Sequence, residues 1–175
     1  MLRRNPRIVV YHAKQCDPKK CTTLKMKRHN LVRVVHQIRR LPRGAIILNP
    51  FSKVALSPAD RERAESRGLA AIDCSWVHAD DVFEILRRGV SRCLPYLIAS
   101  NPVNYGVPTK LTTLEALSAA LYVMGFKDEA EKLVSIFKWG PNFIKLNQKF
   151  LDGYSQAKDS SEIIRLQEEF IPKPR

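Results

Sequence analysis

Cysteine is scarce in this sequence and is not arranged for metal or redox chemistry. The 175 residues include 4 cysteines, and no two of them form the C-x-x-C pair of zinc ribbons and thiol redox centres. With 45% hydrophobic residues, a chain of this length can build a core without disulfide bonds. His12, Cys16 and Cys21 could ligate a metal, but their spacing matches no common zinc motif. The sequence therefore predicts free thiols and no metal.

Long apolar runs and glycine-rich phosphate loops are also missing. No stretch approaches the ~18 apolar residues of a membrane span, which predicts a soluble cytoplasmic protein without a membrane partner. Neither G-x-G-x-x-G nor G-x-x-x-x-G-K-[ST] occurs, so neither a dinucleotide nor a triphosphate is indicated. The paired carboxylates of a metal-dependent nuclease are not evident either.

Acidic residues are nearly missing from the first third of the chain. Residues 1–60 contain 14 Lys and Arg but 2 Asp and Glu, whereas residues 61–175 contain 16 and 15. A general bias towards basic composition would raise both segments, so the asymmetry favours a phosphate backbone as the partner of the first third. The sequence therefore predicts a nucleic-acid-binding face there.

Short apolar runs and helical periodicity divide the chain into two halves. Runs at 8–11, 45–48, 69–72 and 94–99 predict strands, and turn-rich or helical segments separate them. Helices are predicted at 31–41, 57–68, 77–88, 113–124, 128–137, 142–157 and 161–170. This pattern predicts an α/β half with a mainly parallel sheet, residues 1–92, and a mainly helical half, residues 93–175.

Two strand ends carry side chains suited to ligand binding. The run at 94–99 is followed by a segment rich in Pro, Asn and Gly, and Thr112 with Glu115 then forms a capping box that starts a helix. The run at 69–72 delivers Asp73 and Trp76, an acceptor and a stacking surface. The alternatives are an ordinary loop, a helix cap at Asp73 and a core role for Trp76.

Several long blocks resemble one enzyme family in the correct order. The blocks are YHAKQCDPKKCT (11–22), LPRGAIILNPFSKVALSPADR (41–61), IDCSW (72–76), LPYLIASNPVNYGVPTKLTTLEALSAALYVMGF (94–126) and FKWGPNFIKLNQKFLDGY (137–154). Together they are similar to the short, archaeal-type small-subunit rRNA aminocarboxypropyltransferases. The resemblance implies a knotted fold like that of the SPOUT-type RNA methyltransferases.

The resemblance also implies a reaction and a cofactor. Members of this family transfer the 3-amino-3-carboxypropyl (acp) group of S-adenosylmethionine to N3 of a (1-methyl)pseudouridine in small-subunit rRNA during ribosome biogenesis. Asp73 and Trp76 are the implied catalytic residues, with Asp73 as a polar positioning group or base. The implied cofactor contacts are Thr22, Leu48, Pro50, Ile72, Asp73, Trp76, Leu94, Tyr105, Thr109, Thr112, Thr113 and Ala116.

The expected RNA contacts lie in the basic first third, and the protein is expected to act as a monomer. Phosphate contacts are predicted at Lys19, Lys20, Lys25, Lys27, Arg28 and Arg33. Two alternatives stay open. A SPOUT-type methyltransferase would use the same fold and cofactor, and a non-catalytic ribosome-assembly factor would need only the basic charge.

Overall fold

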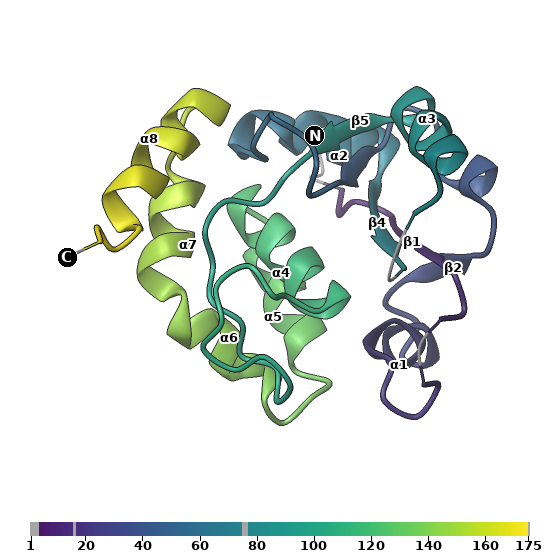
Figure 1. Cartoon of the computed structure of the whole chain (residues 1–175), viewed down its shortest axis with the longest axis horizontal. Helices are drawn as coiled ribbons and strands as arrows, with labels where there is room; N and C mark the ends of the chain where they lie inside the picture. The colour runs from purple at the N-terminus through teal and green to yellow at the C-terminus, as the bar shows by residue number, and fades with distance from the viewer. Residues whose placement is uncertain (1–3, 16, 75–76, 175) are drawn as a thin grey trace.

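A parallel sheet forms the centre of the N-terminal half. The computed structural model describes residues 4–15, 17–74 and 77–174, which contain a five-stranded sheet in the order β2-β1-β4-β3-β5 with every neighbouring pair parallel (Figure 1). The strands are β1 Ile8–His12, β2 Arg33–Val35, β3 Ile46–Leu48, β4 Leu69–Asp73 and β5 Val90–Arg92. Their carboxyl ends lie along one edge of the sheet, where α/β proteins place their ligands.

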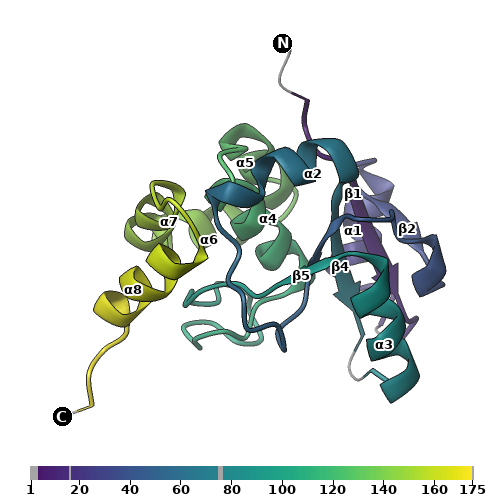
Figure 2. The same cartoon turned by 90° about the horizontal axis from the view of Figure 1, so that it is seen from above.

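Helices surround this sheet and make up the C-terminal half (Figure 2). The described helices are α1 Thr22–Arg28, α2 Arg61–Arg67, α3 Ala79–Arg88, α4 Thr113–Val123, α5 Lys127–Val134, α6 Gly140–Leu146, α7 Gln148–Ser155 and α8 Ser160–Phe170. Two 3-10 turns, η1 Ile38–Arg40 and η2 Pro58–Asp60, complete the set. Within the described residues, no helix combines the length and the apolar character needed to cross a bilayer.

Apolar side chains cover both faces of the sheet, which explains the uninterrupted apolar runs of its central strands. Val10 and Ala71 face the larger core cluster, to which α4 contributes Leu117. Val9 and Ala70 point to the opposite face and join a smaller cluster with residues around α3 and η1. The larger cluster also contains residues of α5 to α8, so the two halves of the chain share one core. The predicted strands at 8–11, 45–48 and 69–72 are confirmed.

The helix predicted at 31–41 is wrong. That segment forms the edge strand β2 followed by η1. Val32, Val34 and Val35 are β-branched and fit a pleated strand, and β2 pairs with β1 from Val9↔Arg33 to Tyr11↔Val35. The basic helix of this region is α1, within and beyond the segment 12–23 that the sequence indicated as a loop.

The strand predicted at 94–99 is also wrong, because the fifth strand is β5. Beyond β5, Ile98 forms an isolated bridge with Pro108. Helix side chains take the place of a neighbouring strand: Asn147 accepts the Ile98 N–H and donates to the Ile98 carbonyl, both at 2.8 Å. Gln167 accepts the Tyr96 N–H at 2.8 Å. The segment is therefore buried and extended without belonging to the sheet.

The same asparagine explains a third difference. One helix was predicted over 142–157, but the chain forms α6 and α7 with Asn147 between them. Asn147 has φ −103° and ψ 11°, and its side chain also donates to the Phe143 carbonyl at 2.9 Å. Asn147 binds the backbone of Ile98 and ends α6, so the predicted single helix is interrupted at this residue. The capping box predicted at Thr112 and Glu115 is confirmed.

Candidate functional site

A cavity of about 510 Å³ opens at the carboxyl edge of the sheet. It lies between the ends of β3 and β4, the segment after β5, and the loop that leads into α4. Its lining residues are Leu48, Asn49, Pro50, Ala71, Ile72, Cys93, Leu94, Pro95, Thr109, Leu111, Thr112, Thr113 and Ala116. One wall is thus apolar and the other carries threonine hydroxyls, a combination suited to a small molecule with an apolar ring and polar groups.

Most of the predicted cofactor residues meet at this cavity. Those that line it are Leu48, Pro50, Ile72, Leu94, Thr109, Thr112, Thr113 and Ala116. Thr22 begins α1, Asp73 ends β4, and Tyr105 lies on the neighbouring loop, 63% exposed; none of these three is part of the lining. Trp76, predicted as catalytic, lies outside the described residues.

A buried carboxylate shapes the loop that forms the threonine wall. Glu115 is fully buried and accepts the backbone N–H groups of Ser100 (2.7 Å), Asn101 (2.9 Å) and Thr112 (2.7 Å). The Asn101 amide and the Thr112 hydroxyl donate to it as well, at 2.9 and 3.0 Å. Glu115 therefore joins both ends of the 100–112 loop to the first turn of α4. The sequence indicated this residue only as half of a capping box.

Thr109 holds an unusual backbone conformation at the cavity wall. Its φ is +64°, in the left-handed region that a β-branched residue rarely adopts. The Thr109 N–H donates to the Leu97 carbonyl at 2.9 Å, which fixes the strained residue in place. Such a conformation costs on the order of 1–3 kcal/mol and persists where the surroundings enforce it, commonly at functional sites.

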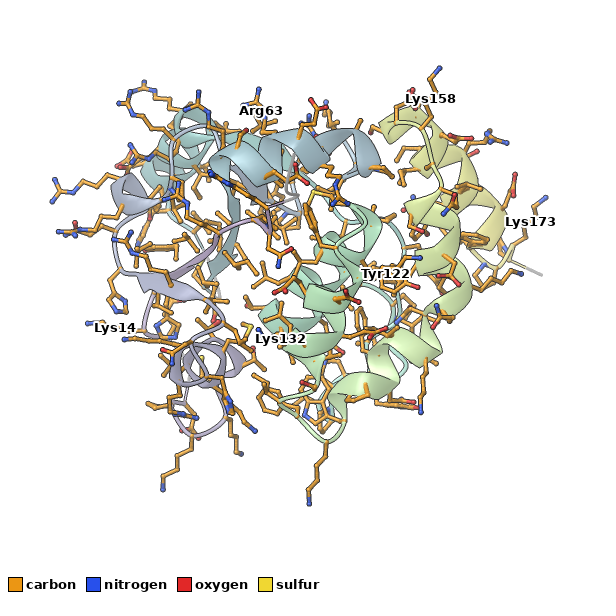
Figure 3. The ribbon with its side chains drawn as sticks, turned by 180° about the vertical axis from the view of Figure 1, so that it is seen from behind. Lys14, Arg63, Tyr122, Lys132, Lys158 and Lys173 are labelled. Carbon is orange, nitrogen blue, oxygen red and sulfur yellow. The ribbon has the colours of Figure 1, made fainter. Side chains whose placement is uncertain are left out.

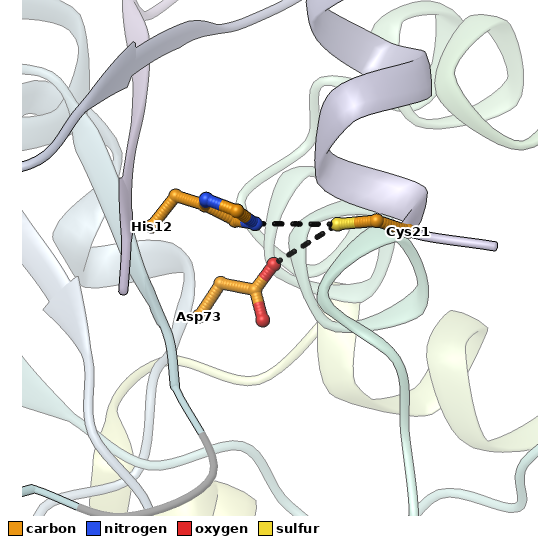
Figure 4. Close-up of side chains that lie close together, drawn as sticks. All are labelled: His12, Cys21 and Asp73. Carbon is orange, nitrogen blue, oxygen red and sulfur yellow. Dashed lines mark hydrogen bonds between the residues drawn. The ribbon is translucent and has the colours of Figure 1, made fainter. Parts of the chain in front are cut away.

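Beside the cavity, four side chains form a hydrogen-bonded network, of which Figure 4 shows His12, Cys21 and Asp73. His12 and Asp73 are register partners at the ends of β1 and β4, and Cys21 and Thr23 come from the start of α1. Cys21 Sγ lies 3.5 Å from His12 Nε2 and 3.8 Å from Asp73 Oδ2, and the Thr23 hydroxyl donates a short hydrogen bond to the same oxygen. From the described residues, Oδ1 of Asp73 accepts no hydrogen bond.

The hydrogen bonds of His12 assign its tautomer. The Lys14 N–H points at His12 Nδ1 at 3.3 Å, so Nδ1 accepts and Nε2 carries the proton. Burial lowers the pKa of the imidazole below its usual value, and the charge of Asp73 counteracts part of that shift. His12 is therefore neutral at pH 7 and donates to Cys21, whose thiol donates to Asp73.

His12, Cys21 and Asp73 are also the described residues that could hold a metal ion. Their ligand atoms lie within 4.8 Å of one another. A metal on Nε2, however, requires that Nδ1 carry the proton, and Nδ1 faces the Lys14 N–H donor. The hydrogen-bonding pattern thus favours an internal network over a metal centre. Cys16, the third member of the set weighed from the sequence, lies outside the described residues.

The predicted RNA contacts follow α1 from one edge of the sheet to the other. Lys19 and Lys20 precede the helix and are exposed, near the carboxyl edge. Figure 3 shows Lys14, which belongs to the same connection between β1 and α1, on the opposite side of the molecule from Lys158 and Lys173. The remaining predicted contacts are Lys25, Lys27, Arg28 and Arg33. All of the six except Lys25 are exposed.

The far end of this series reaches a second hollow. Lys27 and Arg33 line a cavity of about 560 Å³ together with Arg7, at the amino edge. Lys25 instead places its Nζ 4.1 Å from the centre of the Phe137 ring. The six residues therefore form an extended strip, and only its first part lies near the cavity at the carboxyl edge.

Comparison with known proteins relates this geometry to an established family. A family described as "Ribosome biogenesis protein, C-terminal" matches residues 46–171, and one described as "Possible Fer4-like domain in RNase L inhibitor" matches residues 6–40. The second segment contains two cysteines, Cys16 and Cys21, whereas an iron–sulfur cluster of the ferredoxin type takes four thiolates.

Two curated relatives and one solved structure give the closer relationship. The 16S rRNA aminocarboxypropyltransferase of Methanopyrus kandleri is 52% identical, covering 94% of this chain and 98% of the relative. That of Methanocaldococcus jannaschii is 47% identical, covering 96% and 98%. The SAM-dependent rRNA:acp-transferase Tsr3 from Vulcanisaeta distributa has a TM-score of 0.82 and 45% identity, covering 94% of this chain and 97% of that chain. This chain belongs to the 16S rRNA aminocarboxypropyltransferase family.

Proposed function

We propose that this chain transfers the acp group of S-adenosylmethionine to N3 of a (1-methyl)pseudouridine in small-subunit rRNA. The names of the family members support the reaction class, the donor and the rRNA acceptor. The observation that supports the site is the cavity at the carboxyl edge, because residues implied as cofactor contacts from four separate segments line the same space. The identity and position of the acceptor nucleotide are part of the proposal.

The cavity residues fit the proposed cofactor. Leu48 and Ile72 offer apolar surface for an adenine ring, while Thr113 in the first turn of α4 offers a hydroxyl and a backbone N–H for polar groups. Thr22, at the start of α1, is proposed to bind the part of the cofactor that faces the His12–Asp73 network. Trp76 completes the proposed contacts as an apolar wall beside the methyl group.

S-adenosylmethionine supplies an electrophilic γ-carbon attached to a sulfonium, so that the new N3–carbon bond forms as the carbon–sulfur bond breaks and a neutral thioether leaves. The protein's main contribution is orientation, because each carbon on the sulfonium can react and the pocket decides which one meets the nucleophile. Asp73 is proposed to take the N3 proton or to align the uracil ring. Among the described residues none donates to its Oδ1, which can serve this task while Cys21 and Thr23 hold Oδ2.

The deciding experiment uses a small-subunit rRNA hairpin that lacks the N3 modification. The wild-type protein is incubated with S-adenosylmethionine labelled in the carboxyl group or in the methyl group. Label transferred from the carboxyl position alone is the expected result. Transfer of methyl label would favour the SPOUT-type methyltransferase alternative, and RNA binding without any transfer would favour the assembly factor.

The role of Asp73 is tested with Asp73→Asn, which keeps the shape of the side chain. The single-turnover transfer rate should fall by about 10²–10⁴-fold, the usual range for a general base, with cofactor affinity retained. Asp80→Asn is the control, because Asp80 is an exposed acid on α3, away from the lining of the cavity. An unchanged rate in Asp73→Asn would remove the base from the mechanism.

The proposal also covers how the chain is organised. Residues 1–92 would form a basic domain with the RNA-binding strip, and residues 93–175 a helical domain that completes the cofactor pocket. The cavity lining, drawn from both parts, supports this division. We also propose a monomer in the cytoplasm, and analytical ultracentrifugation tests the monomer.

A SPOUT-type trefoil knot is part of the same proposal. The resemblance to the family carries this part of the proposal, and the segment after β5 that would take part hydrogen-bonds to Asn147, Tyr154 and Gln167. Single-molecule pulling from both termini is the test. A knotted chain would remain shorter than its full contour length, whereas full extension would exclude the knot.

A further inference from the structure

Exposed apolar side chains stand on two loops at the rim of the cofactor cavity. Phe51 is 82% exposed and directly follows Pro50, a lining residue. Val103 is 88% exposed on the loop that ends at Thr109, another lining residue. The loops come from different halves of the chain, and Figure 2 shows the segments before α2 and after β5 on the same side of the molecule. Neither side chain contributes to the core.

The turn that carries Phe51 is held by hydrogen bonds. The Phe51 N–H donates to the Asn49 side chain at 3.0 Å, and the Ser52 N–H donates to the Asn49 carbonyl at 3.1 Å. The Ser52 hydroxyl donates to the Ser91 carbonyl of β5 at 3.1 Å, and the Asn49 N–H donates to the Arg92 carbonyl at 2.8 Å. The sheet therefore presents this ring to solvent on an ordered support.

The opposite loop is equally ordered. The Asn104 N–H donates to the Asn101 side chain at 2.9 Å, and the Gly106 N–H donates to the Ala99 carbonyl at 2.8 Å. Asn101 in turn binds the buried Glu115. Val103 lies between these anchored positions. An apolar side chain that an ordered loop holds in water forgoes about 1.5–3 kcal/mol of burial, which a binding surface recovers on contact.

The charge of the two loops indicates which partner they fit. Residues 49–56 and 100–111 contain no Asp or Glu, and each segment carries an exposed lysine, Lys53 and Lys110. Aromatic surface combined with isolated cations and no acidic residues is the composition of single-stranded RNA sites, where bases stack on rings and ammonium groups meet phosphates. A protein partner would have no such need for an acid-free rim.

We propose that Phe51 is a stacking platform for an RNA base next to the modified uridine, with Val103 as an apolar wedge on the opposite loop. The inference rests on the proposed function, because it requires the target base to enter the cavity. A base can do so only when it is unstacked from its neighbours, and that costs free energy. A flat apolar platform at the entrance replaces the lost stacking and holds the strand open.

The test compares Phe51→Ala and Phe51→Trp with wild-type protein in binding the same rRNA hairpin, with 2-aminopurine beside the target. Phe51→Ala should bind roughly 5- to 150-fold more weakly, the range for loss of one base–aromatic stack, and should lose the quenching of 2-aminopurine. Phe51→Trp should retain both. Val103→Ala should weaken binding less. Cofactor affinity should stay unchanged in all three variants.

Phe83→Ala is the matched control, because Phe83 is a phenylalanine 64% exposed on α3, outside the cavity lining. It should bind the hairpin as the wild type does. Wild-type affinity and quenching in Phe51→Ala at equal salt would overturn the inference. So would loss of binding to a ribosomal protein alone, with RNA binding intact. If the wild type transfers no acp group yet its RNA binding depends on Phe51, the proposed function fails and the platform stands.

Discussion

Replacing Glu115 should separate the geometry of the cavity wall from the stability of the rest of the fold. Its carboxylate accepts five hydrogen bonds, three of them from backbone N–H groups. Alanine would leave those three donors buried without an acceptor, and each unsatisfied donor costs about 1–3 kcal/mol. Allowing for relaxation of the loop, Glu115→Ala should lower the free energy of unfolding by about 3–5 kcal/mol.

Glu115→Gln is the sharper variant, because it keeps the volume and one acceptor oxygen. That oxygen can serve the N–H groups of Ser100 and Asn101, while the new NH₂ group faces two other donors, the Thr112 N–H and the Asn101 side-chain amide. The two mismatched pairs should cost about 2–4 kcal/mol once the loop relaxes. Because the mismatch lies at the start of α4, it should also weaken S-adenosylmethionine binding by more than the loss of stability explains.

The assays are urea unfolding and calorimetric titration with S-adenosylmethionine at a temperature where the variants remain folded. Glu168→Gln is the control, because Glu168 is an exposed acid on α8, far from the lining of the cavity. If Glu115→Gln unfolds within about 0.5 kcal/mol of the wild type, the range of surface substitutions, and binds the cofactor equally well, then Glu115 does not organise this loop.

Three further predictions concern the residues around the cavity. Thr109→Gly should raise the free energy of unfolding by about 1 kcal/mol, because glycine removes the strain of the left-handed backbone conformation. It should also lower the transfer rate, because a hydroxyl is lost from the cavity wall. Thr109→Asn should be intermediate in stability, because asparagine tolerates this φ. Burial lowers the pKa of His12 in the folded state, so the unfolded chain binds more protons than the folded chain as the pH drops through about 6.5. The free energy of unfolding should therefore fall with the pH over that range. His12→Gln should reduce the difference in this free energy between pH 7.5 and 5.5, measured by urea unfolding. Co²⁺ added to the protein should give no thiolate charge-transfer band. If a band appeared and Cys21→Ser abolished it, the three residues would form a metal centre in place of the hydrogen-bonded network.

The central strands could be predicted because their buried residues are consecutive in the sequence and all apolar. Runs such as 69–72 are apolar on both faces, and only a parallel sheet covered by helices accommodates them. The run at 94–99 carries the same signal and is partly buried, but its backbone partners include the side chains of Asn147 and Gln167. No local sequence pattern shows whether such a run will pair with a neighbouring strand or with amide side chains that lie about 50 or more residues further along the chain.

The site was predicted in part, and the resemblance contributed most of its residues. Strand ends marked the correct edge, but the network of His12, Cys21 and Asp73 was not anticipated. The sequence held a signal for His12 and Asp73. Each directly follows a predicted strand, so both would lie at the same edge of the sheet if the two strands were neighbours. The place of β4 between β1 and β3 is a long-range pairing, which periodicity does not report.

The amide pairing between Asn147 and Ile98 has a consequence for synthesis of the protein. Ile98 belongs to the segment behind the cavity wall, and its partner Asn147 directly precedes α7. Tyr96 of the same segment binds Gln167 of α8 through its N–H and the hydroxyl of Tyr154 of α7 through its carbonyl, at 2.8 and 2.9 Å. The sheet and α4 can emerge from a ribosome well before those helices do. A nascent chain would therefore lack the finished cavity until α8 has left the ribosome, so that this rRNA-modifying enzyme cannot become competent before that helix has been made.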